Sequence, residues 1–515
     1  MKVKHKVPIL VILLILVLWS SSCRKDFEYA SSNGHLSFSK DTVYLDTVFK
    51  GIGSSTYSLK VYNTTKDDIL IPSIKLRNGF NSQYRLNVDG KAGKDFEDIP
   101  LYAEDSLFIF IETNVTLLPD ETSQLLYTDA IQFDDDIYLQ EVELVTLAKD
   151  AVFLYPKRDS KGTKEKIMLY TREDGTEVWV ESFELSDDQL HFNNNKPYVI
   201  YGYAAIPENQ KLIIEAGARI HFHNSSGILI RQTASLQVNG AYSDDQDILD
   251  GEVIFEGDRL EPSFSNTPGQ WGTVFISKGS LNNTINHLTI RNAEIGIYVE
   301  GNIEIDETTL DISNSQIHNS SLFNLWARSA NIKAQNILLG NAGSSSLKCD
   351  LGGRYEFIHA TISNYWTNGF RTGRALSLRN YADSDVNSGV DLIQADFRNS
   401  IIDGNSMSEL TLSSNGENIF NYSFENCFIK FKESVPVSST DSFYNFEGPN
   451  FANCILNGDP DYFDARANDF RIGLDSDVIN KGSIPFAQQV PFDLLNRERI
   501  SAPDLGVYQA LEKVE

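Results

Sequence analysis

The sequence predicts an all-β chain in which an amino-terminal β-sandwich is followed by a right-handed, single-stranded parallel β-helix. Residues 34–149 alternate apolar and polar side chains, as the strands of a half-buried sheet do. Farther along, one hexapeptide recurs seven times between residues 287 and 458. The apolar period of about 3.6 residues that a helical solenoid needs is absent from these repeats. Together the three observations favour strands throughout.

The first 22 residues have the features of a secretion signal. Three lysines precede the apolar run 8–19, which is shorter than the roughly 20 residues that cross a bilayer. The segment that ends at Cys23 resembles the lipobox of bacterial lipoproteins, except that Ser20 occupies the usual leucine position. This resemblance implies acylation of Cys23 and a lipid anchor in a membrane. An ordinary cleaved signal is the alternative.

Residues 24–28, Arg-Lys-Asp-Phe-Glu, resemble the acidic export signal of Bacteroidota surface lipoproteins. The resemblance implies a protein of the outer membrane that is lipid-anchored at the cell surface, with the periplasmic face as the alternative. Residues 23–33 are expected to form a short tether between the anchor and the first domain.

The chain is strongly acidic, with 44 Lys and Arg against 71 Asp and Glu. Removal of residues 1–22 takes away three lysines and no acid, which leaves 41 cations, 71 anions and a net charge of −30. Such a charge excludes nucleic-acid binding through bulk electrostatics. It also predicts overall repulsion from anionic polysaccharides unless a local basic patch overrides it.

The first domain is expected over residues 34–149. Segments 57–63 and 106–112 place every second side chain on one face, and the polar run 63–68 forms a turn. About seven such strands with polar turns suggest two packed sheets. Their order resembles the immunoglobulin-like domains that precede repeats in many bacterial surface proteins. That resemblance implies a spacer or a docking module.

Residues 150–200 are predicted to connect the two domains and to lead into the β-helix. The stretch 157–166 is charged and rich in turn residues, and Trp179 and segment 196–200 are expected close to the first coil. Two aliphatic segments within 212–230 then resemble the first coils of parallel β-helix proteins.

The hexapeptide repeat is the most specific pattern in the sequence. Its copies start 27, 22, 23, 40, 27 and 27 residues apart. In order, the copies are HLTIRN at 287, NSQIHN at 314, NILLGN at 336, HATISN at 359, NSIIDG at 399, NCFIKF at 426 and NCILNG at 453. The first position is Asn or His, the fourth is Ile or Leu, and the sixth is Asn or Gly except for Phe431.

Equivalent positions of such repeats stack, because one coil rises by one strand spacing of about 4.8 Å. The fourth positions are expected to stack inside the coil. The sixth positions are expected to adopt left-handed turn conformations, which Asn and Gly tolerate best, and stacked Asn side chains can hydrogen-bond along the axis. Cys427 and Cys454 share the second position and are expected to stack as small buried side chains, with a disulfide as the alternative.

The segment 270–274, the repeats and the end of the chain together resemble the right-handed parallel β-helix (pectin-lyase-like) superfamily in Bacteroidota. The matching parts of the ending are DFRI at 469, VINKG at 478, DLLNR at 493 and PDLGVY at 503. The resemblance covers residues 201–510 and implies the fold, whereas function varies widely on that fold. It also implies a carboxy-terminal cap over the open end of the coil, where strand edges would otherwise be exposed.

No catalytic constellation is evident in the sequence. Enzymes on parallel β-helices need clustered carboxylates, or a basic residue beside a calcium-binding acidic cluster. The acidic run 134–136 is expected to be a solvated turn. No cofactor is predicted, and calcium at the acidic loop 244–247 is the alternative. His221 and His223 share one face of a strand but lack further ligands, so no metal site is predicted.

The 40-residue spacing carries an insertion that exceeds the other spacings by 13 to 18 residues. Aromatic rings stack on sugar faces, arginine forks bind carboxylates or sulfates, and insertions on one face of a solenoid often form its binding surface. The candidate ligand-binding residues in and just before the insertion are Arg354, Tyr355, Trp366, Phe370, Arg371 and Arg374. The alternative is an insertion that packs on the coil and pairs its arginines with local acids.

The leading functional hypothesis is a non-catalytic surface lipoprotein that uses its β-helix to bind a glycan or another envelope protein. A polysaccharide lyase or hydrolase on the same fold is the first alternative. A structural subunit of an outer-membrane transport or assembly complex is the second, and it would co-purify with an outer-membrane protein. No nucleic-acid partner is expected.

Overall fold

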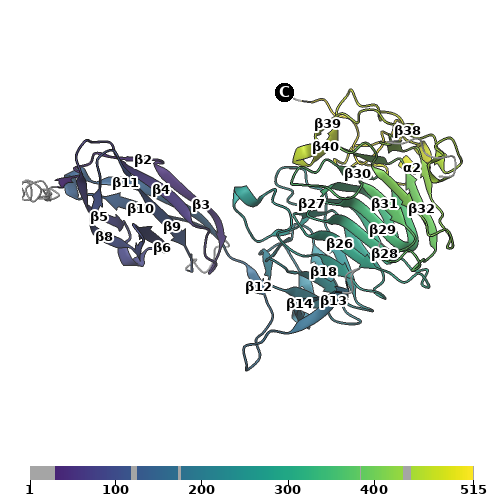
Figure 1. The fold of residues 1–515 in the computed structure, drawn as a ribbon. Helices are drawn as coiled ribbons and strands as arrows, with labels where there is room; N and C mark the ends of the chain where they lie inside the picture. Colours follow the sequence, from purple (N-terminus) through teal and green to yellow (C-terminus); the bar gives the residue numbers. More distant parts are fainter. Residues whose placement is uncertain (1–28, 117–123, 172–175, 383, 433–441, 514–515) are drawn as a thin grey trace, which may run out of the picture. The chain divides into compact units, whose positions relative to one another are not determined.

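A computed structural model of the chain describes residues 29–116, 124–171, 176–382, 384–432 and 442–513. The chain divides into two compact units, the first ending at Asp150 and the second starting at Ala151. Both consist mainly of strands (Figure 1). Among the described residues, no helix is long and apolar enough to cross a membrane. Cys23 and the predicted secretion signal lie outside the described residues, so lipidation stays a prediction.

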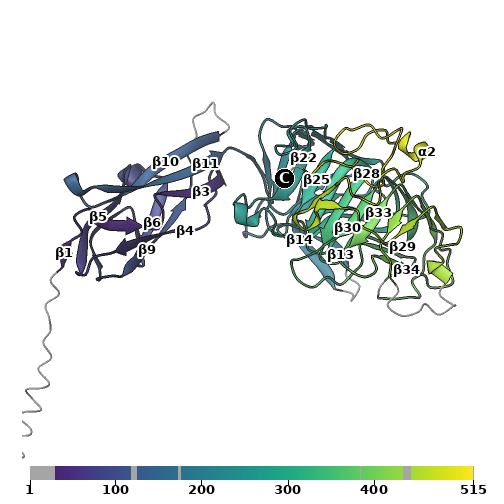
Figure 2. The ribbon, with the colours of Figure 1, turned by 90° about the horizontal axis from the view of Figure 1, so that it is seen from above.

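The amino-terminal unit is a β-sandwich of two sheets, as predicted (Figure 2). One sheet joins, in spatial order, β1 (Ala30–Ser31), β5 (Ile69–Leu76), β10 (Gln124–Phe133), β11 (Gln140–Lys149) and β3 (Thr42–Phe49), with β8 (Asp95–Leu101) also paired to β5. The other joins β2 (Leu36–Phe38), β4 (Tyr57–Asn63), β9 (Ser106–Thr113), β6 (Tyr84–Val88) and β7 (Lys91–Gly93). The short 3₁₀ helices η1 (Gly79–Asn81) and η2 (Asp136–Tyr138) lie between strands. The alternating apolar side chains of both sheets form one core.

Two details of this unit differ from the expectations. Ala30–Ser31, within the predicted tether, pairs with β5 as a parallel edge strand. Asp134, expected in a solvated turn, is 1% exposed and accepts hydrogen bonds from the Ser32 hydroxyl and the backbone N–H of Gly34. Because a buried carboxylate needs such donors, Asp134 anchors the first described residues to the sandwich.

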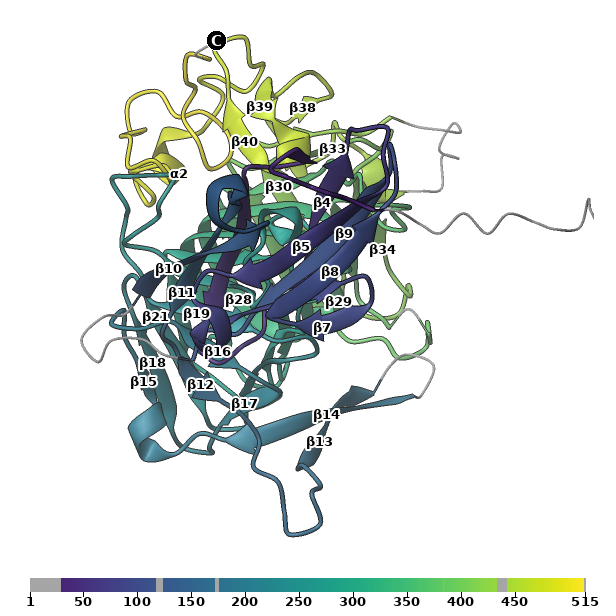
Figure 3. The same cartoon turned by 90° about the vertical axis from the view of Figure 1, so that its left-hand side faces the viewer.

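The second unit is the predicted coil of parallel strands (Figures 1 and 3). The described strands between residues 152 and 456 form one 27-stranded sheet in which successive coils pair in parallel, apart from one hairpin. The first strands are β12 (Val152–Leu154), β13 (Lys166–Thr171), β14 (Glu177–Glu184), β15 (His191–Phe192), β16 (Tyr198–Ile200), β17 (Tyr203–Ile206), β18 (Lys211–Glu215), β19 (Arg219–Phe222), β20 (Gly227–Ile230), β21 (Ser235–Asn239), β22 (Val253–Gly257), β23 (Val274–Ile276) and β24 (Asn283–Asn286).

The coil continues through the hexapeptide repeats to its last strand. The remaining strands are β25 (Leu288–Arg291), β26 (Ile295–Glu300), β27 (Leu310–Ser320), β28 (Phe323–Ala342), β29 (Ser345–Ile358), β30 (Thr361–Asn364), β31 (Leu376–Arg379), β32 (Leu392–Arg398), β33 (Ile401–Gly404), β34 (Leu410–Ser413), β35 (Ser423–Glu425), β36 (Phe428–Ile429), β37 (Phe451–Ala452) and β38 (Ile455–Leu456). The loops hold η3 (Asp187–Gln189), η4 (Pro262–Phe264) and η5 (Ser442–Tyr444).

The coil begins within the predicted connector. β12 pairs in parallel with β16, and the end of β14 pairs with β17. β13 and β14 also form an antiparallel hairpin at the edge of the first coils (Figure 3). The parallel ladder therefore starts at Val152 rather than near residue 201. The strands of these coils are short and carry no hexapeptide, so the sequence pattern does not reveal them.

The fourth positions of the repeats stack inside the coil, as predicted. In register along the axis, they are Ile290, Ile317, Leu339, Ile362, Ile402, Ile429 and Leu456. All are fully buried except Leu456 on the last strand, which is 40% exposed. Full burial of one such side chain stabilises the fold by about 1.5–3 kcal/mol.

The left-handed turn of the repeat lies mainly at its first position. All seven first-position residues, five Asn and two His, have φ between 48° and 56°. The sixth position has a positive φ in only some copies, and Asn364 and Gly404 lack it, so the prediction for the sixth position was wrong there. Asn and His tolerate this conformation better than most residues, which explains the restriction at the first position.

Ladders of like side chains run along the coil axis. Asn319 donates to the side-chain oxygen of Asn292 at 2.6 Å, and Asn336 donates to that of Asn314 at 2.8 Å, which confirms the predicted asparagine stacking. An inner ladder of parallel aromatic rings, with centroids 5.0 to 5.2 Å apart, consists of Phe357, Phe397, Phe424 and Phe451.

The two second-position cysteines are free thiols on neighbouring coils. Cys427 is fully buried and donates to the backbone oxygen of Phe397 at 3.3 Å, whereas Cys454 is partly exposed. Burial raises the pKa of the Cys427 thiol well above its ordinary value, so this thiol stays protonated.

The carboxy-terminal residues 459–511, called the tail, contain β39 (Tyr462–Asp464), η6 (Ala465–Ala467), β40 (Asp469–Ile472) and α2 (Ile484–Ala487). The tail packs on the outward side of the repeat strands, against Leu338, Ile401 and Phe428. With Thr361 between Leu338 and Ile401, these residues stack in one outward column, so they present a mainly apolar stripe that needs cover. The expected end cap is thus a lateral cover over several coils.

Buried polar side chains tie the tail to the coil. His359, a fully buried first-position residue, donates through Nδ1 to the backbone oxygen of Gly506 at 3.0 Å and accepts at Nε2 from the Asn399 amide at 3.0 Å. Arg499, 1% exposed, donates to the side-chain oxygen of Asn336 at 2.6 Å. Burial lowers the pKa of His359 well below 6.5, which keeps the imidazole neutral.

The His359→Asn variant is expected to make the stability of the coil less sensitive to mild acid. The pKa of His359 is lower in the folded state than in the unfolded state, where it is about 6.5. The contribution of His359 to the free energy of unfolding is therefore fully present above about pH 6.5 and is lost as the pH falls toward the folded pKa. Between pH 7.5 and 5.0 the free energy of unfolding of the wild type should fall by up to about 2 kcal/mol more than that of the variant. Urea midpoints at the two pH values measure this difference.

Asn is a suitable replacement because five other copies of the repeat carry it at the same position with the same backbone conformation. The readout is the difference in pH dependence, so a uniform loss of stability from the lost Gly506 hydrogen bond does not affect it. Equal acid sensitivity in the two proteins would contradict the neutral, buried state of His359.

Candidate functional site

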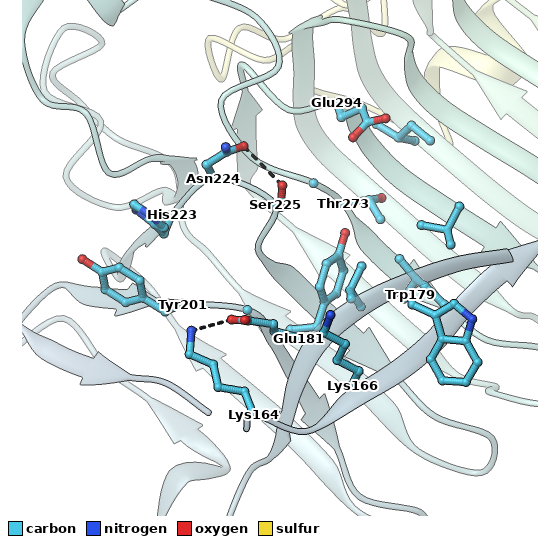
Figure 4. A pocket seen from close by; sticks show the side chains of 17 residues that line it. Lys164, Lys166, Trp179, Glu181, Tyr201, His223, Asn224, Ser225, Thr273 and Glu294 are labelled. Carbon is cyan, nitrogen blue, oxygen red and sulfur yellow. Dashed lines mark hydrogen bonds and ion pairs between the residues drawn. The ribbon is translucent and has the colours of Figure 1, made fainter. Parts of the chain in front are cut away.

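A cleft of about 530 Å³ lies where the β13–β14 hairpin meets the corner of the first coils (Figure 4). The hairpin segment contributes Lys164, Lys166, Leu169 and residues 178–181. The coils contribute residues at 201–203, 223–225 and 272–273, and the pair 294–295. These positions are turns or strand ends at equivalent points of successive coils, so the ladder stacks them along the axis although they are far apart in sequence.

Aromatic rings line this cleft. Trp179 on β14 is 56% exposed, and its indole N–H donates to Glu177 at 2.8 Å. The Tyr203 ring is buried, and it has room because Gly227 and Gly272 lie against it: a Cβ at these glycines would come within 2.6 and 2.1 Å of Tyr203 atoms. The exposed indole lies at one side of the residues that line the cleft, and His223 lies at the other (Figure 4).

Charged and polar groups surround the rings (Figure 4). Lys164 and Glu181 form an ion pair of 2.5 Å across the hairpin. The His223 ring lies 4.5 Å from that of Tyr201, and its Nδ1 is 2.8 Å from an Asp258 oxygen. That hydrogen bond raises the pKa of His223 above its ordinary value, so the imidazole gains positive charge near neutral pH.

The composition of the cleft suits a polyhydroxylated ligand. Its volume lies within the usual range of small-molecule sites, which combine apolar walls with a few convergent polar groups. An indole face can stack on the C–H face of a sugar. Glu181, Asn224, Thr273 and Glu294 provide donors and acceptors for hydroxyl groups.

The described parts of the chain contain no group of three or more His, Cys, Asp or Glu residues that could hold a metal ion. In the predicted histidine pair, His221 is 6% exposed and lies 3.5 Å from Glu256, whereas His223 opens into the cleft. In the acidic loop 244–247, the Asp245 carboxylate accepts the backbone N–H of Asp247 at 2.9 Å, so it orders the loop itself.

The structure does not bring the six sequence-predicted ligand residues onto one surface, and two of the three aromatic ones are buried. Tyr355 is 1% exposed, because β29 turns it into the coil, where its hydroxyl donates to the backbone oxygen of Gly352 at 2.7 Å. Trp366 is 8% exposed, because the insertion packs its ring against the coil near Gly343. The prediction that these rings stack on a ligand was therefore wrong.

The other four predicted residues differ in their partners and in their exposure to solvent. Arg354 forms an ion pair with Asp306 at 2.8 Å. Arg371 is buried against Glu409, so the structural interpretation of the insertion holds for this arginine. Phe370 is fully exposed. Arg374 is exposed and lines a second, basic pocket.

Sequence reasoning missed most of the cleft. Trp179 was expected only as part of the connector, and Tyr203, Glu181 and Glu294 carried no recognisable pattern. The cleft combines a hairpin with four coils that precede or flank the first hexapeptide. The available signals were Trp179, expected close to the first coil, and His223 of the histidine pair.

No known family model matches this sequence, and no curated protein matches it. Among solved structures, the catalytic unit of a thermostable GH87 α-1,3-glucanase from Streptomyces thermodiastaticus strain HF3-3 aligns over 72% of this chain and 79% of that chain, with 8% identity and a TM-score of 0.20. A family 123 glycoside hydrolase from Clostridium perfringens aligns over 23% of this chain and 30% of that chain, with 7% identity and a TM-score of 0.16.

The periplasmic chaperone SfaE aligns over 22% of this chain and 57% of that chain, with 12% identity and a TM-score of 0.16. Alignments with TM-scores of this size carry no argument about the fold or the function. The fold and the site of this protein therefore rest on its own residues.

Proposed function

We propose that this protein is an exported glycan-binding protein, lipid-anchored through Cys23 at the surface of the outer membrane, which holds a glycan in the cleft without cleaving it. The anchor and the location rest on the sequence of residues 1–28 alone. The observation that carries the binding function is the cleft, whose lining includes the exposed Trp179 together with Glu181, His223 and Glu294; Figure 4 shows Trp179 and His223 on opposite sides of the view, with Glu181 between them.

The arrangement favours binding over hydrolysis. A glycosidase needs one carboxyl group that is free to donate a proton and a second that faces it across the scissile bond. Here Glu181 is held by Lys164 at 2.5 Å, which ties up one of the two carboxylates that line the cleft. A fixed ion pair and an exposed indole are suited to holding sugar hydroxyls and a sugar face.

The Trp179→Ala variant is expected to weaken glycan binding by at least about tenfold, because an exposed indole that a ligand covers contributes about 1.4 kcal/mol or more. Trp179→Phe should keep part of the affinity, since a smaller ring still stacks. The measurement is binding of the purified full-length protein, in mild detergent, to a panel of immobilised polysaccharides.

Phe80→Ala serves as the matched control, because Phe80 is 83% exposed in the amino-terminal unit and lies outside the cleft. Equal binding by Trp179→Ala and the wild type would contradict the proposal. Release of reducing or unsaturated ends from any polysaccharide of the panel would instead support the enzymatic alternative. Stoichiometric recovery of an outer-membrane protein without glycan binding would support an accessory subunit.

A further inference from the structure

A second pocket, of about 330 Å³, lies on the outward face of the coils that follow the cleft. β29 contributes Ser345 and Lys348, β31 contributes Ser377 and Arg379, and the insertion contributes Arg374. The part of the insertion that reaches the pocket is fixed, because Thr372 donates to Ser344 at 3.1 Å and Arg371 is paired with Glu409 at 2.6 Å.

This basic pocket continues the face on which the cleft lies. One outward column runs in register through Phe275, Tyr298, Trp326, Lys348, Ser377 and Thr411. The column changes from aromatic to polar at Lys348, whose Nζ lies 4.9 Å from the centroid of the Trp326 ring. Ile295 of the cleft pairs with Phe323 of the basic pocket. The nearest edges of the two sites are therefore one strand spacing of about 4.8 Å apart, whereas β17, which pairs with the hairpin strand β14, lies six ladder steps from β31.

The charge of this pocket is opposite to that of the protein. The chain carries 71 acidic and 44 basic residues, yet the ionisable residues that line the pocket are all cations: Lys348, Arg371, Arg374 and Arg379. A cluster of this sign in so acidic a chain creates a local positive potential that attracts anions.

Buried carboxylates balance only part of this charge. Glu409, fully buried, pairs with Arg371, and Asp350, also fully buried, lies 3.6 Å from Lys348 and 3.2 Å from Arg328. Arg374 is exposed at the mouth of the pocket, and within the described ranges it forms no ion pair. The mouth of the pocket therefore keeps a net positive charge.

We propose that the basic pocket binds a carboxylate or sulfate group carried by the glycan. Arg374 supplies a guanidinium fork that matches two oxygens of such an oxyanion. The Ser345 and Ser377 hydroxyls supply further donors. The proposal rests on the proposed glycan binding, since the neighbouring cleft holds another sugar unit of the same glycan chain. It names the ligand class as an acidic glycan, which the overall charge of the protein would otherwise repel.

The test compares three polymers with one backbone: dextran, carboxymethyl-dextran and dextran sulfate. Binding to the full-length protein is measured in mild detergent over a range of salt concentrations. Arg374→Gln is expected to weaken binding of the two charged polymers by about five- to tenfold, to reduce their salt dependence and to leave dextran unchanged. Arg466→Gln, at an exposed arginine of the tail, is the matched control and should change nothing.

The outcomes separate the two proposals. If Arg374→Gln binds the charged polymers as the wild type does, the basic pocket does not bind the oxyanion and only the cleft remains. If the charged polymers bind through Arg374 but Trp179→Ala has no effect on any polymer, the pocket stands and the proposed cleft fails. If Arg374→Gln weakens binding of only one charged polymer, the charged group of that polymer, carboxylate or sulfate, is the one that the pocket binds. If none of the three polymers binds, both proposals are overturned.

Discussion

Replacement of Arg371 by alanine is expected to lower the free energy of unfolding of the coil by about 3–5 kcal/mol. The Arg371 side chain is 6% exposed, and its guanidinium lies 2.6 Å from the fully buried Glu409 carboxylate. Arg371 also donates to the backbone oxygen of Asn364 at 2.8 Å. Without the arginine, Glu409 is left as a buried charge that only backbone N–H groups contact, and such a charge is costly.

Urea denaturation followed by tryptophan fluorescence measures this effect, because all four tryptophans after residue 22 lie in the second unit. Arg371→Ala combined with Glu409→Gln should recover part of the loss, since the amide carries no charge. Arg374→Ala is the matched control and should stay within about 0.5 kcal/mol of the wild type. A midpoint for Arg371→Ala equal to that of Arg374→Ala would show that the ion pair does not hold the insertion.

This result also bears on the basic pocket. The insertion that carries Arg374 is fixed at one point by the Arg371–Glu409 pair, and the backbone N–H of Ala375 donates to Glu409 at 2.9 Å. Loss of the pair should therefore disorder the mouth of the pocket. For this reason Arg374, and not Arg371, is the residue whose substitution reports on binding alone.

The second large effect is expected for Phe397→Ala, which should destabilise the coil by about 3–5 kcal/mol. Phe397 is fully buried and stacks between Phe357 and Phe424, with ring centroids 5.1 and 5.0 Å away. Truncation removes two ring contacts and leaves a cavity that neighbouring coils cannot fill, because the ladder spacing fixes their positions.

Hydrogen exchange would show where the loss occurs. In a solenoid each coil contacts mainly its neighbours, so faster exchange should concentrate in β29, β32 and β35, which carry the stacked rings. Phe370→Ala is the control, because Phe370 is fully exposed and its removal should leave the urea midpoint unchanged. Uniform protection across all coils in Phe397→Ala would rule out the ladder as a local determinant of stability.

The sequence by itself determined the architecture where a pattern repeats. Alternation in segments such as 57–63 predicted the sandwich, and the spacing of the hexapeptide predicted the parallel coil with its fourth positions inside. These predictions succeed because side-chain direction in a strand follows a period of two, and a coil of nearly constant length brings the same position back one strand spacing later.

Only the tertiary structure decided the start of the coil, the place of the tail and the sites. Tyr355 and Arg371 had the residue types of a ligand site, but the strand register and the partner Glu409 bury them. Trp179 and His223 belong to one cleft because a hairpin lies over coils distant in sequence. The spacing of residues in the sequence predicts which face of a strand each one occupies. Burial and charge balance depend on which other parts of the chain pack against that face.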